Sequence, residues 1–147
     1  MRRLLVGLLL LNAVLFPSHA EARDTVYNLK IDDAMHDPRY NQELGNEVAF
    51  FFGAQKTPAV EQNFGEFVTN RKTNSVGKPD QEACRWAMLS ALRSLRERAL
   101  KMGGNAVVNI QSYYRKNATT SETTYECHAG AIIAGVALRG TVVKLRR

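Results

Sequence analysis

Cys84 and Cys127 are the only cysteines of the chain and the residues with the clearest chemistry. An even cysteine count in a small domain of an oxidising compartment favours a disulfide. Cys84 falls in the first turn of an expected helix, and Cys127 lies late in an expected strand that this helix should cover. A Cα–Cα approach of about 5.5 Å is therefore attainable. We expect a Cys84–Cys127 disulfide, which would stabilise the fold by about 4 kcal/mol in the chain-entropy model.

The alternative for the same residues is a metal site formed by Cys84, Cys127 and His128, with His36 as a further ligand. Adjacent residues of a strand point to opposite faces of the sheet, so Cys127 and His128 converge on one ion only at a bulge. His36 also lies in an acidic stretch, but the spacing of its neighbouring aspartates matches no calcium loop.

Catalytic motifs find little support in the sequence. The chain has no Gly-x-Ser-x-Gly nucleophile motif and no phosphate-binding Gly-x-x-x-x-Gly-Lys-Ser/Thr loop. We therefore expect a protein that is not an enzyme and that uses no cofactor. Tyr113 and Tyr114, next to Arg115 and Lys116, could form a surface for stacking and phosphate contact, although exposed tyrosines at a strand end need no ligand to explain them.

A long amphipathic helix and the strand after it must position these residues. The helix is predicted to run from Gln81 to Met102, with Asp80 as an acceptor for its free N–H groups. Gly103 or Gly104 should end the helix in a left-handed conformation and lead directly into a β-branched strand from Asn105. The apolar positions fall on one face of the helix: Cys84, Met88, Leu92, Leu95, Ala99 and Met102.

The expected fold class is α+β, with one long helix covering one face of a small mixed or antiparallel sheet of about four to six strands. Glycines at positions 130, 135 and 140 suggest bulges or close backbone approach in the last strand region. Further strands are predicted at residues 25–31, 48–53, 64–71, 123–127 and 139–145. Residues 32–46 read as an acidic loop with one helical turn.

Residues 1–20 have the features of a secretory signal peptide. Arg2 and Arg3 precede an apolar run, and Ser18-His19-Ala20 is a small-x-small cleavage motif. Cleavage is expected after Ala20, with Ala22 as second choice, and a retained anchor is the alternative. The mature protein is then expected in the periplasm, with residues 21–47 as an extension and 48–147 as a single domain.

The predicted mature chain is basic, because removal of Arg2 and Arg3 leaves 18 basic and 14 acidic residues, a net charge of +4. The excess is concentrated after Arg85, where an anionic partner could bind. Arg85, Arg93 and Arg96 lie within about 80° of one another on a helical wheel, and we call them the basic edge. An envelope protein or an anionic envelope polymer is the expected partner; arginines that merely keep a helix edge soluble are the simpler alternative.

The segment Ala99-Leu-Lys-Met-Gly-Gly-Asn-Ala-Val-Val-Asn-Ile110 resembles the helix-to-strand signature of the YbjQ-like proteins. Residues 139–143 resemble the closing strand of that family, and the match spans roughly residues 64 to 145. Asn109 replaces a usual glycine. More distantly, the chain resembles RcsF-like envelope-stress lipoproteins, which have four cysteines and a lipid anchor. The resemblance implies a small sheet covered by a helix and assembly into a homo-oligomer, and a heavy-metal role inferred for the family brings no ligand set to this chain.

Overall fold

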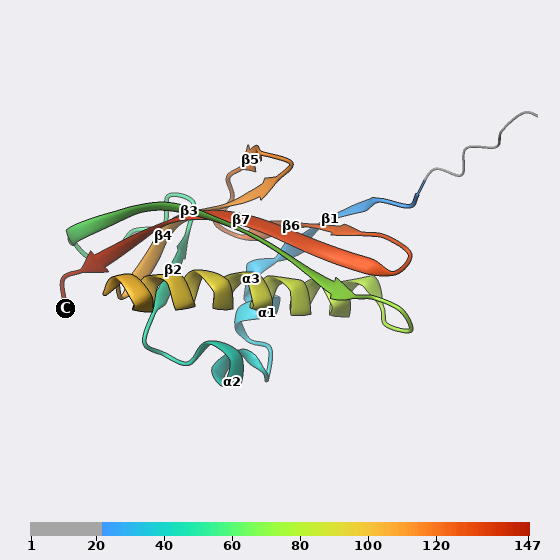
Figure 1. The fold of residues 1–147 in the computed structure, drawn as a ribbon, viewed down its shortest axis with the longest axis horizontal. Helices are drawn as coiled ribbons and strands as arrows, with labels where there is room; N and C mark the ends of the chain where they lie inside the picture. The colour runs from blue at the N-terminus through green and yellow to red at the C-terminus, as the bar shows by residue number, and fades with distance from the viewer. Residues whose placement is uncertain (1–21) are drawn as a thin grey trace, which may run out of the picture.

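The computed structural model describes residues 22–147 as an α+β fold in which one long helix lies against a mixed, seven-stranded sheet (Figure 1). The predicted fold class is confirmed, but the sheet has seven strands instead of four to six. The elements are β1 (Thr25–Lys30), α1 (Ile31–Met35), α2 (Tyr40–Leu44), β2 (Ala49–Phe52), β3 (Val60–Asn74), α3 (Asp80–Met102), β4 (Ala106–Tyr114), β5 (Asn117–Thr119), β6 (Thr124–Ala129) and β7 (Ile133–Leu145). The predicted signal peptide lies outside the described residues.

Strand β7 is the centre of the sheet. β3 pairs along the whole of one side of β7, while β4 and β6 share the other side, β4 along its C-terminal half and β6 at its start. β1 extends the sheet beyond β6, and β2 extends it beyond β4 as the parallel strand. The short β5 pairs with the end of β4. The two ends of β7 therefore carry different neighbours, and β6 brings the residues after Cys127 to the start of β7.

Helix α3 ends at the predicted Met102 and begins at Asp80, one residue before the predicted Gln81. Gly103 ends it with φ +83°, as expected for a left-handed C-terminal residue. At the other end Pro79 is the N-cap residue and no side chain caps the helix, so the predicted capping role of Asp80 is wrong. The carboxylate of Asp80 instead accepts hydrogen bonds from Arg23 and Tyr27.

The predicted apolar stripe of α3 packs on the sheet. Five of its members are fully buried, and only Met102 in the last turn is half-buried. Val142 belongs to the cluster beneath the helix, whereas its neighbour Val143 packs in a smaller cluster with Ala106 and Leu145. Adjacent strand residues face opposite sides, so this second cluster lies on the sheet face that α3 leaves open.

Three parts of the chain depart from the predicted elements. β3 begins at Val60 and β7 at Ile133, both earlier than the predicted starts at residues 64 and 139. The prediction missed these residues because exposed polar residues in β3, and glycine and alanine in β7, hide the alternation that marks a strand. Two short helices occupy the predicted acidic loop. Residues 22–47 are integral to the fold, since β1 pairs with all of β6 and α2 packs on α3. Within residues 22–147, no helix has the length and apolar character needed to cross a membrane.

Candidate functional site

Cys84 and Cys127 form the predicted disulfide, with a Cα–Cα distance of 5.9 Å. Both residues are fully buried, and the bond ties the first turns of α3 to β6. The alternative metal site lacks its thiolates in this state, because the two sulfurs are bonded to each other. His128 faces the other side of the sheet, while His36 follows α1 and contacts the carbonyl of Asp32. In the described part of the chain, no three His, Cys, Asp or Glu residues are placed to hold a metal ion.

Each arginine of the basic edge already has a carboxylate partner. Their ion pairs are Arg85–Asp37 at 3.5 Å, Arg93–Glu43 at 2.8 Å and Arg96–Glu47 at 2.9 Å. All three carboxylates come from the acidic segment between β1 and β2, which packs along α3. An external anion must therefore compete with this segment. One indication of these ion pairs is present in the sequence, because the chain before Arg85 is slightly acidic and the chain from Arg85 onward is basic.

Asp37 is the most strongly held of these carboxylates. Arg39 donates to it from Nε, Nη2 and the backbone N–H, at 2.6, 2.5 and 3.0 Å, and Arg85 adds a second charge. These contacts, with the Arg39 side chain foremost, lower the pKa of Asp37 to about 2. The Arg39 guanidinium also lies 4.1 Å from the centroid of the Trp86 ring. Asp37 thus joins the α1–α2 segment to helix α3.

The Asp37→Asn variant is expected to be less stable than the wild type by about 1 kcal/mol at neutral pH, allowing for the solvent exposure of the arginines. The depressed folded-state pKa places this stabilisation above the ordinary value of 3.8 and removes it as the pH falls towards 2. Urea unfolding of both proteins at a series of pH values measures the difference.

The matched control is Asp33→Asn, which removes an exposed aspartate of α1 that forms no ion pair within residues 22–147. This variant should unfold like the wild type. If Asp37→Asn lowers the free energy of unfolding as much at low pH as at neutral pH, the ionised carboxylate is not the source of the stabilisation.

His128 lies on the open face of the sheet within a set of polar and aromatic contacts. Its Nδ1 is 3.0 Å from Asp24 Oδ1, and its Nε2 is 2.6 Å from Glu126 Oε1. The imidazole also stacks on Tyr114, with ring centroids 3.3 Å apart. Both ring nitrogens and one ring face are therefore occupied, which leaves His128 in a structural role at the wall of a cavity.

This open-face cavity has a volume of about 310 Å³ and lies between β3 and the β4–β5 turn. Its floor follows from strand register, because Gly135 pairs with His128 on one side and Lys72 on the other, so the three lie in one row on one face. Gly135 contributes no side chain to that row. Lys72 and Arg115 line the cavity, and neither forms an ion pair with a carboxylate of residues 22–147. The cavity thus offers two cations to an external group, beside the carboxylate of Asp24, which contacts His128 in the same lining.

The tyrosines predicted as a stacking surface have their rings covered within the chain. The Arg139 guanidinium lies 4.6 Å from the Tyr113 ring centroid, and the Arg115 guanidinium lies 5.1 Å from the Tyr114 ring centroid. Of the predicted surface, Tyr114 and Arg115 line the open-face cavity. Lys72 was missed by the sequence analysis, because only pairing across β7 brings β3 beside the β4–β5 turn.

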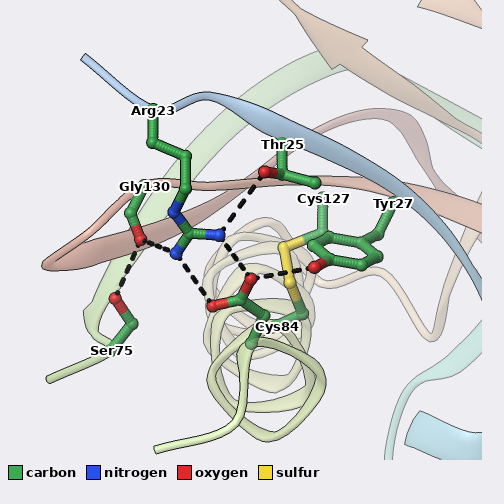
Figure 2. Close-up of polar contacts among 8 residues, drawn as sticks. Arg23, Thr25, Tyr27, Ser75, Cys84, Cys127 and Gly130 are labelled. Carbon is green, nitrogen blue, oxygen red and sulfur yellow. Dashed lines mark hydrogen bonds and ion pairs between the residues drawn. A yellow bond between two sulfur atoms is a disulfide. The ribbon is translucent and has the colours of Figure 1, made fainter. Parts of the chain in front are cut away.

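The first described residues are held at the start of α3 (Figure 2). Arg23 donates from both terminal nitrogens to Asp80, at 2.7 and 3.1 Å, and also to the carbonyl of Gly130 at 2.5 Å. Tyr27 donates to the same carboxylate at 2.9 Å. These contacts, led by Arg23, lower the pKa of Asp80. Arg23 therefore joins the start of the described chain to the β6–β7 turn.

The chain matches no family model, no curated protein and no solved structure in the comparisons made. The resemblance to YbjQ-like proteins stays a prediction.

Proposed function

We propose that the protein is a non-catalytic binding module of the bacterial envelope and that it binds an anionic group of an envelope protein or polymer in the open-face cavity. The observation that carries this proposal is the pair of cations Lys72 and Arg115, which line one cavity and have no carboxylate partner among residues 22–147. The export part of the proposal rests on the predicted signal peptide. A buried disulfide agrees with an oxidising compartment.

The cavity supports this function better than the basic edge does. Binding at Arg85, Arg93 and Arg96 would break three ion pairs before new ones form. Binding at Lys72 and Arg115 requires only the removal of water, and the exposed lysine can adjust its position. Asn70, one row further along β3, adds an amide donor to the same lining.

The test is binding of fluorescein-labelled inorganic polyphosphate, followed by fluorescence anisotropy at low and at physiological salt. Lys72→Glu combined with Arg115→Glu is expected to weaken binding by about tenfold or more, since two attractive charges become repulsive. The probe should be recovered with unchanged chain length, as expected of a protein without catalysis.

Two further variants make the result specific. Lys56→Glu with Lys101→Glu changes the net charge equally at exposed sites outside the cavity, and it should affect binding less. Replacement of Arg85, Arg93 and Arg96 by glutamine should also have a small effect, because these arginines are already paired. If the lysine control weakens binding equally, the interaction depends only on net charge and not on the cavity. If the glutamine variant weakens binding more than the cavity variant does, the basic edge is the binding surface.

A further inference from the structure

Exposed aliphatic side chains gather at one end of the molecule, where the β3–α3 and β6–β7 connections meet. Val76, Ile132 and Ile133 expose 59%, 61% and 45% of their surface, and they line a cavity of about 490 Å³. Val76 comes from the β3–α3 connection, Ile132 is the last residue of the β6–β7 connection, and Ile133 is the first residue of β7. We call these three residues the aliphatic tip. A contiguous apolar patch on a small basic domain marks a surface that binds something.

One backbone hydrogen bond ties together the two connections that carry the tip, and further hydrogen bonds form within each of them. Ser75 N–H donates to the carbonyl of Ile132 at 3.0 Å, and Gly130 N–H donates to that of Ile133 at 2.7 Å. Val76 N–H donates to the side chain of Asn74 at 2.8 Å. These backbone groups are already satisfied, so the tip can enter an apolar environment at a lower desolvation penalty than a loop with free backbone groups.

Lysines without carboxylate partners flank the tip. Lys72 lies in its lining, and Lys78 lies in the same connection as Val76; both are exposed and form no ion pair within the described chain. The sequence has no acid between Arg71 and Pro79 and none between Cys127 and Gly140. Lysine can bury its methylene stem along an apolar boundary while its ammonium group reaches anionic headgroups.

The described chain begins at the same end of the molecule. Figure 1 shows the start of β1 beside the two connections, and Arg23 donates to the carbonyl of Gly130, two residues before Ile132. Ala22 continues in the sequence towards the apolar run from Leu4 to Phe16. The aliphatic tip therefore lies at the end of the molecule where the described chain begins.

We infer that the aliphatic tip docks on an anionic phospholipid bilayer, with Val76, Ile132 and Ile133 in the interface and Lys72 and Lys78 at the headgroups. Charge favours this occupant, because apolar side chains flanked by two lysines match an apolar interior bounded by phosphates. The inference is independent of the anion bound in the open-face cavity, although Lys72 borders both sites.

The test is sedimentation of the purified exported protein with vesicles of phosphatidylglycerol and phosphatidylcholine, and with phosphatidylcholine alone. The wild type should bind the anionic vesicles, and Val76→Ser with Ile132→Ser should weaken this binding by about tenfold or more. Val60→Ser with Val68→Ser is the matched control, since these valines of β3 are similarly exposed but lie outside the tip. The tip variant should still bind polyphosphate like the wild type.

A fluorescence measurement reports whether the tip enters the bilayer. Ile132→Trp, made in a Trp86→Phe protein so that it holds the only tryptophan, should shift its emission to the blue on anionic vesicles and be quenched by brominated lipid.

Three results would overturn the inference. They are a wild type that does not bind anionic vesicles, a tip variant that binds them equally well, and a wild-type dimer that the serine substitutions convert to a monomer. The last result would identify a second copy of the chain as the occupant. If the tip variant binds anionic vesicles normally while Lys72→Glu with Arg115→Glu does not, the vesicles bind through the open-face cavity and not through the tip.

Discussion

Replacement of both Cys84 and Cys127 by alanine is expected to lower the free energy of unfolding by about 4 kcal/mol. The disulfide closes a loop with a sequence separation of 43 residues, and it restricts the unfolded chain over that length. In the folded protein it joins α3 to β6 at a point where both cysteines are fully buried. Guanidinium unfolding of the variant and of the wild type, monitored by far-UV circular dichroism, measures the difference.

The reduced wild type is the control for this prediction. If the covalent bond supplies the stability, wild-type protein unfolded and refolded under a thiol reductant should match the alanine variant. The native disulfide should also resist reduction without denaturant, because no sulfur is accessible to a thiolate. A double variant as stable as the oxidised wild type would show that the bond adds nothing to the packing of α3 on the sheet.

Gly140→Ala is expected to lower the free energy of unfolding by about 2 kcal/mol, a typical result of overpacking. A Cβ atom at position 140 would lie 2.6 Å from Val107 Cγ1 and 3.2 Å from Ile110 Cγ1. Both neighbours are fully buried in β4, and a valine methyl group cannot turn away without a new clash. Urea unfolding measures the loss.

Two comparisons isolate the collision. Gly135→Ala, in the same strand, places its Cβ no closer than 3.6 Å to another group, so it should change stability by only a few tenths of a kcal/mol. In a Val107→Ala protein the offending methyl group is gone, and the further substitution Gly140→Ala should cost much less than it does in the wild type. Equal costs in both backgrounds would contradict the steric explanation.

The two proposed binding surfaces share the start of β7 and the end of β3. The open-face cavity lies above Gly135, and the aliphatic tip begins two residues earlier at Ile133. A protein docked on a bilayer through the tip would therefore hold the cavity close to the headgroups. Because one set of variants changes cations and the other changes aliphatic side chains, polyphosphate and vesicle binding separate the two roles.

The helix, its apolar face, the glycine turn and the disulfide could be predicted from the sequence. These features depend on residues close in the chain or on a periodicity that a single element reveals. Leu92 and Leu95, for example, follow the helical spacing that buries them, and Gly103 follows the last turn as a left-handed residue. The pairing of Cys84 with Cys127 followed from their even number and from the expectation that the helix covers the strand.

The individual ion pairs and the two proposed binding surfaces depend on contacts that form only in the folded chain. Arg85, Arg93 and Arg96 became partners of the acidic segment because α1 and α2 fold back along α3, which no local pattern specifies. Lys72 lies on the same sheet face as His128 because both residues pair with Gly135, one from each neighbouring strand. Strand pairing and side-chain exposure arise from contacts between segments far apart in the sequence, so spacing along the chain does not encode them in a form that can be read directly.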